Sequence, residues 1–276
     1  MQFARASMPV LAAWIAAMVL ATASAATAGT IGFRTDAEVK AGPGVDAKIT
    51  LTHTGDETAE YVGVRAEMLG RAMDGTAVPA LGPGQSHSWN FHLFDAVANG
   101  VYAIVLRSTY TDANGYPFEV VGTAVATVGV QPAPRIFGSV EVPHLTKDGE
   151  ATARLTAKRP PGRSGSVEVR LVAPSGLEVT PATATLSFDA TGRATAEFRV
   201  RNLKLLPGTT VNVFGLVSAS DPGFPQTDTI RGSVRIAAAK PRVTSPVFYE
   251  AAGAMLLLLA LLEAARWAAA RRHTTA

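Results

Sequence analysis

The sequence predicts an all-β protein with two tandem antiparallel β-sandwiches, followed by one C-terminal transmembrane helix. Three observations support this fold class. Apolar and polar residues alternate with a period of two through the middle of the chain, turn signals separate these runs, and a long apolar run lies near the C-terminus. The length of 276 residues leaves room for two domains of ordinary size.

Residues 1–28 are predicted to be a signal peptide. Arg5 precedes an apolar run of about a dozen residues, and the small residues at 23–25 and 26–28 both fit the pattern that a signal peptidase reads. Cleavage after Ala25 and cleavage after Ala28 both remain open. The alternative is an uncleaved anchor, for which about 18 apolar residues are expected. An export signal places the following chain outside the cytoplasm.

Half-buried strands are predicted where the alternation is clearest, and no long helical pattern interrupts them. The segments are 47–54, 61–68, 101–106 and 167–172, and further strands are predicted at 120–128 and 229–237. Turn signals such as Gly82-Pro83-Gly84, Asn99-Gly100 and Asn114-Gly115 recur between strands. Short alternating strands without intervening helices favour antiparallel sandwiches over a parallel α/β sheet.

Pro132 and Pro134 mark the best domain boundary, because proline fixes the backbone and cannot donate to a sheet ladder. They divide the region into predicted domains at 29–131 and 135–240, with a short stiff linker between. The patterns of 100–104 and 110–117 recur at a nearly constant offset in 209–213 and 219–225. Each pair of segments is expected to form a hairpin, which supports a common architecture for both halves.

A resemblance to known domains lies at the start of these hairpins. Asp95, Asn99-Gly100 and Tyr102 resemble the tyrosine corner of immunoglobulin-like (Ig-like) domains, in which a Tyr opening the penultimate strand bonds back to the chain; Ile104 stands where antibody domains have Cys. The segment 206–209, Leu-Pro-Gly-Thr, is similar to the start of a late strand in fibronectin type III and bacterial Ig-like domains, with Val211 in place of the usual Tyr. Residues 30–239 thus look like CARDB-type or related Ig-like modules of bacterial and archaeal envelope proteins.

The segment 246–268 is predicted to be a transmembrane helix, followed by a short cytoplasmic tail at 269–276. Glu250 and Glu263 lie near its ends, where a carboxylate is tolerated better than at mid-membrane. Glu263 is three residues from Arg266, so the two can pair near the headgroups, and Trp267 suits the membrane interface. The alternatives are a sorting signal and a buried helix of a soluble domain. The latter needs a polar stripe that 251–262 lacks.

Composition and charge exclude several classes of function. The chain has no Cys, which removes disulfides, thiolate zinc sites, iron–sulfur clusters and cysteine nucleophiles. The net charge of +3 comes mainly from arginines in the two terminal segments. The middle of the chain is close to neutral and has no basic stripe, so nucleic-acid binding is not expected.

No residue pattern predicts a catalytic, cofactor or metal site. His87 and His92 are five residues apart and face opposite sides of a strand, which favours structural or solvent roles over metal binding. Asp112, Asp148 and Asp221 lie in turns, where they are expected to bond backbone amides, and no single loop supplies enough ligands for calcium. His87 stands between Ser86 and Ser88, but adjacent strand residues cannot share a proton, and recognised catalytic motifs are absent.

The leading hypothesis is a non-catalytic envelope protein, single-pass in the cytoplasmic membrane, with its ectodomain in the periplasm or extracellular space. It would present Ig-like domains to other envelope or membrane proteins as a scaffold, adhesin or assembly accessory, with Trp89, Tyr116 and Phe118 as a possible interaction surface. One alternative is a glycan-binding module, which depends on Trp89 because the other Trp residues lie in the terminal segments. The other is an enzyme with a site assembled from distant loops.

Overall fold

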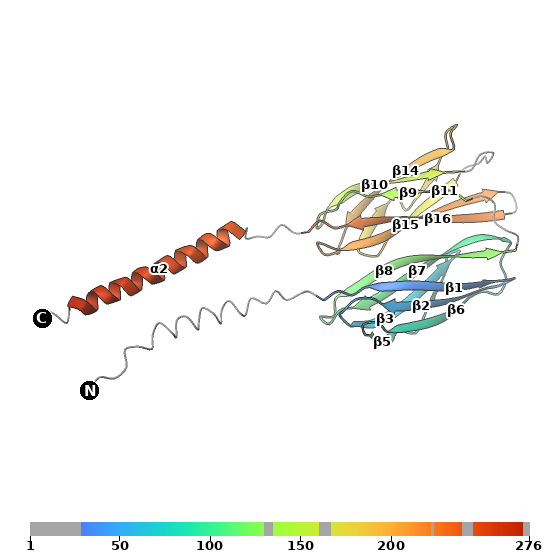
Figure 1. Ribbon diagram of the computed structural model, residues 1–276. Coiled ribbons are helices and arrows are strands. Elements are labelled where there is room, and N and C mark those ends of the chain that lie inside the picture. Colours follow the sequence, from blue (N-terminus) through green and yellow to red (C-terminus); the bar gives the residue numbers. More distant parts are fainter. Residues whose placement is uncertain (1–28, 130–134, 160–166, 222–223, 239–244, 273–276) are drawn as a thin grey trace.

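The computed structural model describes residues 29–129, 135–159, 167–221, 224–238 and 245–272. The predicted signal peptide at 1–28 and the predicted linker at 131–134 lie outside these residues. The described chain forms two β-sandwiches and one helix (Figure 1). The fold is mostly β, as the alternation predicted.

The first sandwich, which we call domain 1, contains eight strands. They are β1 (Phe33–Ala41), β2 (Val45–His53), β3 (Ala59–Met68), β4 (Arg71–Asp74), β5 (Val78–Leu81), β6 (Ser86–Phe94), β7 (Gly100–Thr111) and β8 (Pro117–Val128). One sheet has the order β1-β2-β6. In the other, β7 lies between β3 and β8, and both β4 and β5 pair with β3. Strands such as β2 bury every second residue, so the two sheets enclose a single core.

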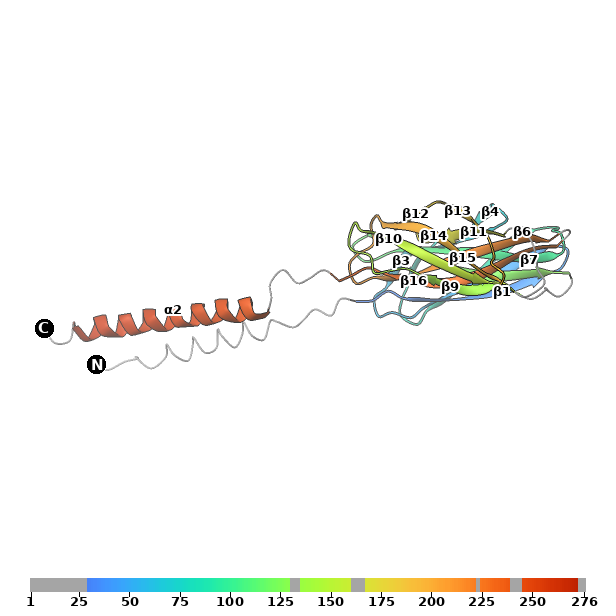
Figure 2. The same cartoon turned by 90° about the horizontal axis from the view of Figure 1, so that it is seen from above.

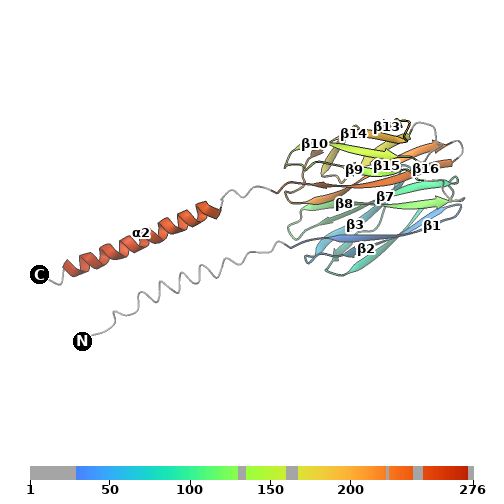
Figure 3. The same ribbon diagram turned by 45° about the horizontal axis from the view of Figure 1, so that its top comes forward.

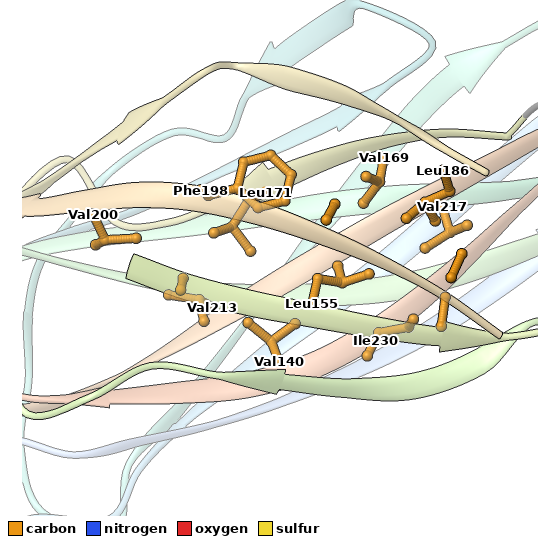
Figure 4. Close-up of a cluster of buried hydrophobic side chains, with 14 of the residues drawn as sticks. Val140, Leu155, Val169, Leu171, Leu186, Phe198, Val200, Val213, Val217 and Ile230 are labelled. Carbon is orange, nitrogen blue, oxygen red and sulfur yellow. The ribbon is translucent and has the colours of Figure 1, made fainter. Parts of the chain in front are cut away.

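The second sandwich, domain 2, also contains eight strands. They are β9 (Phe137–Glu141), β10 (Glu150–Lys158), β11 (Val167–Val172), β12 (Leu177–Thr180), β13 (Thr183–Leu186), β14 (Arg193–Asn202), β15 (Thr210–Asp221) and β16 (Phe224–Arg235). One sheet has the order β12-β14-β10-β9 and the other β16-β15-β11-β13, and β9 also pairs with β16. Side chains from both sheets meet between them, with Phe198 of β14 beside Leu171 of β11 (Figure 4).

The sequence predicted the hairpins well. The last two strands of each domain form a hairpin, β7–β8 in domain 1 and β15–β16 in domain 2, as the repeated pattern predicted. The predicted strand 167–172 coincides with β11, and 120–128 lies within β8. The arrangement departs from a purely antiparallel one, because β16 pairs in parallel with β9 and forms a parallel bridge to β7 of domain 1, and Leu145 and Ile236 form an isolated parallel bridge.

The two domains lie side by side and pack face against face (Figure 3). Six apolar residues form a separate cluster between the two sheets: Ala103, Val105, Val121, Val172, Phe214 and Leu216. Arg170 of domain 2 pairs with Glu67 of domain 1 at 3.1 Å. Arg107 binds the Glu119 carboxylate and donates to the Ala173 carbonyl oxygen at 3.1 Å. Apolar burial and charged contacts therefore hold the domains together.

Close backbone approach between the domains depends on Gly100. A Cβ atom at this position would lie 2.6 Å from the Pro225 carbonyl oxygen, so a larger residue cannot fit without a shift. Next to it, Val101 of β7 and Gln226 of β16 form the parallel bridge. This contact joins the β7 sheet of domain 1 to domain 2.

The two-domain body has distinct ends. β1 begins and β16 ends at one end, whereas β8 ends and β9 begins at the opposite end (Figure 1; Figure 2). The turn after β7, which carries Tyr116, and the turn before β15, which carries Leu206, lie at the first end, because β8 and β15 both run opposite to β16 and start where it finishes. Both side chains are exposed.

The C-terminal helix α2 spans Ser245–Arg272, slightly longer than the predicted 246–268, so part of the predicted tail is helical. Glu263 and Arg266 approach each other at 4.0 Å, as their spacing predicted, and Trp267 is exposed. Within the residues that the structure describes, no helix combines the length and the apolarity that a bilayer crossing requires.

Candidate functional site

A groove of about 600 Å³ follows the outer edge of β8. Its floor is a run of six consecutive residues, 120–125, so both faces of β8 border the groove and the edge of the strand lies at its centre. Among the described strands β8 pairs only with β7, which leaves the N–H and C=O groups of its other edge without a sheet partner. We call this feature the β8 groove.

The walls of the β8 groove come from both domains. Thr35, Ala37 and Val39 of β1 form one wall, and Asn212, Phe214 of β15 and Arg231 of β16 form the other. In Figure 1, β8 lies between β1 on one side and β15 and β16 on the other. The groove therefore lies along domain 1 and is bounded on one side by domain 2.

The polar side chains that line the groove include two arginines, Arg34 and Arg231, and hydrogen-bonding groups such as the Asn212 amide. Arg231 donates from Nε and Nη2 to Asn212 Oδ1, at 3.3 and 3.0 Å, so its positive charge faces a neutral partner. Arg34 lies beside the β1 wall and pairs with Asp36 at 3.0 Å. None of the described residues that line the groove carries a carboxylate. The apolar part of the same wall is Phe214, which is buried against domain 1.

Trp89 does not belong to an exposed interaction surface, and this corrects the sequence-based prediction. Its side chain is 5% exposed, and its Nε1 donates to the Thr76 carbonyl oxygen at 2.8 Å. The residues at 89, 91 and 93 all point into the core of domain 1, an alternation that is visible in the sequence. The glycan-binding alternative loses the side chain on which it depended.

Tyr116 and Phe118 lie at the β7–β8 hairpin but differ in exposure. Tyr116 is 63% exposed, in a turn where Asp112 Oδ1 accepts hydrogen bonds from the Asn114 and Tyr116 N–H groups, both at 2.9 Å. Phe118 is half-buried and stacks on Tyr110, with ring centroids 5.4 Å apart. Burial raises the pKa of Tyr110 to about 12. Of the predicted surface residues, only Tyr116 offers most of its side chain to solvent.

The predicted tyrosine corner is confirmed in domain 1. The Tyr102 hydroxyl donates to the Ala98 carbonyl oxygen at 2.8 Å, four residues back along the chain. Tyr102 is in β7, the penultimate strand of its domain, and desolvation by burial raises its pKa. In domain 2, Val211 at the corresponding place packs against the core. This side chain has no hydroxyl to make the equivalent bond.

His53, His87 and His92 each contact neighbouring side chains of domain 1. His92 is exposed on β6, and its two ring nitrogens lie 2.7 Å from Asp46 and 2.7 Å from Asp95. The hydrogen bond to Asp46, followed by the one to Asp95, raises the pKa of His92. His87 packs edge-on against Trp89. His53 is buried against Phe33, and neither of its ring nitrogens has a hydrogen-bond partner among the described residues.

The candidate metal and catalytic residues remain apart. Within the described part of the chain, no group of three or more His, Asp or Glu side chains could hold a metal ion. Asp148 occupies a turn position with positive φ, and the Asp221 side chain lies outside what the structure describes. Ser86 and Ser88 make cross-strand hydroxyl contacts with Thr52 and Thr50, at 2.9 and 2.8 Å. These hydroxyls serve the β2–β6 pairing.

Comparisons with known proteins do not assign a family. No protein-family model and no curated protein matches the chain. Among solved structures, similar ones include native Escherichia coli α-2-macroglobulin, with TM-score 0.32 and 12% identity over 76% of this chain and 17% of that one. Red sea bream transglutaminase gives TM-score 0.25 and 12% identity over 87% of this chain and 34% of that one. A Porphyromonas gingivalis W83 protein of unknown function gives 0.27 and 11%, over 75% and 99%. The resemblance to CARDB-type modules stays a prediction.

Proposed function

We propose that this chain is a non-catalytic interaction protein of the cell envelope, attached to the cytoplasmic membrane through α2 and presenting its two sandwiches to protein partners. The observation that carries the proposal is the β8 groove, whose two walls come from different domains. A groove with an apolar wall, a cationic side chain and an open strand edge offers the contacts that bind a polypeptide segment. The same groups do not by themselves perform bond-breaking chemistry.

The surface of α2 supports attachment to an apolar environment. Leu256, Leu257, Leu258 and Leu259 are each more than half exposed. Four consecutive helical residues point in four directions around the axis, so apolar side chains surround this part of the helix. Such a surface is stable when lipid or another apolar partner covers it.

The ends of the two-domain body fit the same proposal. β1 begins and β16 ends at one end of the body (Figure 1; Figure 2), so a membrane attachment after β16 would place that end near the bilayer. Tyr116 and Leu206 are exposed in turns at this end. Tyrosine and apolar side chains are favoured at the membrane–water interface.

Membrane attachment is tested by carbonate extraction of cells that express the full chain, together with a variant truncated after residue 244. We expect the full chain to stay in the membrane pellet and the truncated chain to be released. Protease added to intact spheroplasts should digest the two sandwiches. Release of the full chain by carbonate, or resistance of the sandwiches to the protease, would contradict the proposed attachment and orientation.

The interaction role is tested by photo-crosslinking in intact cells. A photo-reactive amino acid replaces Thr123 in the β8 groove, Tyr116 at the hairpin, or Arg154 on the opposite side of domain 2, one at a time. We expect a discrete crosslinked partner from at least one position and a different yield at the others. Absence of any light-dependent product from all three positions would remove the interaction role.

A further inference from the structure

From the geometry of the β8 groove we infer that it binds an extended segment of a partner protein, which pairs with the edge of β8 and carries acidic side chains on the face turned toward domain 2. The inference rests on the proposed interaction role and adds the site, the binding mode and the chemistry of the partner segment. Three features of the groove carry it: the open edge, the two unlike walls and the charge.

The open edge provides the main attraction. Residues 120–125 line the groove without interruption, and a strand of six residues is about 20 Å long. An incoming segment of this length can accept and donate backbone hydrogen bonds along the edge, as one strand does when it is added to a sheet. The β1 wall and the domain 2 wall would lie on the two faces of the added strand.

Domain 2 shows how this position is filled within the chain itself. There, β9 pairs with β10 and also, in parallel, with β16, at Gly232↔Val140 and Ser233↔Glu141. In domain 1, β1 pairs with β2 but with no residue of β8. The edge of β16 therefore pairs with β9, the first strand of the same domain. The corresponding edge of β8 has no strand partner among the described residues.

The walls define the side chains of the partner. Successive residues of an added strand point to opposite faces, so one set meets Thr35, Ala37 and Val39, and the other set meets Phe214 and Arg231. The β1 wall is mostly aliphatic and favours small apolar residues. The Arg231 guanidinium has a neutral partner in Asn212 and favours a carboxylate. The expected segment therefore alternates apolar and acidic residues.

The test measures binding of fluorescent eight-residue peptides to the purified full-length chain by anisotropy. The peptides alternate Val with Asp, or Val with Lys as the matched control. We expect saturable binding of the Asp peptide and about tenfold weaker binding of the Lys peptide. Equal binding of the two peptides, or no binding of the Asp peptide, would overturn the inference.

Backbone pairing is separated from side-chain contact by N-methylation. One version of the Asp peptide is methylated on every Val nitrogen and another on every Asp nitrogen. Only alternate N–H groups of a strand face its neighbour, so one version should lose binding and the other should retain it. Retention by both versions means that no strand is added to β8, which would contradict the inference.

The position of the site is tested with Arg231→Glu and with Arg235→Glu as its control on the same strand. Arg235 is exposed and does not line the groove. We expect Arg231→Glu to weaken the Asp peptide about tenfold and to strengthen the Lys peptide, while Arg235→Glu changes neither. Equal effects of the two substitutions would place the peptide elsewhere.

A second copy of this chain is the competing occupant. If light scattering finds a dimer of the unliganded chain that Arg231→Glu dissociates, the groove binds another copy and the inference of a foreign segment is wrong. Failure of the peptide experiments alongside persistent crosslinking at Tyr116 or Arg154 would remove the β8 groove inference and leave the proposed interaction role intact.

Discussion

The two sandwiches share a strand plan but close their edges differently. In domain 2 the first strand, β9, reaches across to the last strand, β16, and the two pair in parallel. In domain 1 the first strand, β1, remains in its own sheet, and the last strand, β8, borders a groove. Similar alternating sequences thus give one closed edge and one open edge.

The difference has a local physical cause in domain 2. A Cβ atom on Gly232 would lie 2.5 Å from the Val140 carbonyl oxygen, so β9 and β16 approach more closely than side chains permit. In β8, a Cβ atom on Gly122 would meet only Leu106 Cβ, at 3.9 Å. The presence of glycine in both last strands does not distinguish the two edges, but the contacts around each glycine do.

The largest effect is expected from adding a side chain at Gly232, where β9 and β16 approach each other closely. Gly232→Val should destabilise the protein by about 3 kcal/mol, because backbone and not a flexible side chain stands in the way. Gly122→Ala is the control and should change stability by less than about 1 kcal/mol. Urea unfolding of the full chain measures both. If the two substitutions cost the same, the closed edge does not depend on the close approach at Gly232.

The second effect concerns the group that fixes the start of β9. Asp228 of β16 is 4% exposed, and its Oδ2 accepts hydrogen bonds from the Ile136 N–H at 2.8 Å and from Gln226 Nε2 at 2.9 Å. Asp228→Ala removes this acceptor and should cost about 2 kcal/mol. Asp228→Asn keeps an acceptor oxygen and should cost less. Equal losses in urea unfolding would show that the negative charge, and not the hydrogen bonds, secures β9.

The third effect concerns the tyrosine corner of domain 1, compared with the corresponding position in domain 2. Tyr102→Phe removes the hydrogen bond to the Ala98 carbonyl oxygen and should destabilise domain 1 by about 1 kcal/mol. Val211→Ala at the corresponding place in domain 2 removes only apolar contact. Hydrogen exchange resolves the two domains. Loss of protection near β7 after Tyr102→Phe, without loss in domain 2, is the expected result, and uniform loss would contradict it.

The sequence predicted the strands and one corner better than the arrangement of the domains. Alternation specifies which residues of β2 or β11 enter a core, and the Tyr102 pattern specifies a local bond, because both depend on neighbours within a few positions. Trp89 was misplaced although its own strand alternates, since the neighbouring Asn90 and His92 identify the outward face.

The β8 groove could not be predicted in the same way. Val105, Val121 and Phe214 face outward from their own sandwiches, and only the packing of one domain on the other buries them. In the sequence, Arg231 is indistinguishable from any exposed strand residue. It borders the groove because β15 and β16 lie beside β8 in the structure. A surface built by two domains depends on contacts between residues about 100 positions apart, which no local pattern encodes.

The smallest effect concerns the pairs that join equivalent strands in the two domains. In domain 1, His92 lies between Asp46 of β2 and Asp95, and these bonds raise its pKa above the ordinary 6.5. Protonated His92 therefore adds stability that is fully present below pH 6.5 and lost as the pH rises through the higher folded-state pKa. In domain 2, the corresponding strands β10 and β14 carry the Arg154–Glu197 pair, at 3.0 Å, which contains no histidine. We expect His92→Gln to remove part of the decline in stability just above pH 6.5, and Arg154→Gln to leave that decline unchanged. Unfolding midpoints of the two variants and of the unsubstituted protein are measured across this pH window. If the midpoint of His92→Gln falls with pH as steeply as that of the unsubstituted protein, the hydrogen bonds of His92 with Asp46 and Asp95 do not contribute to stability.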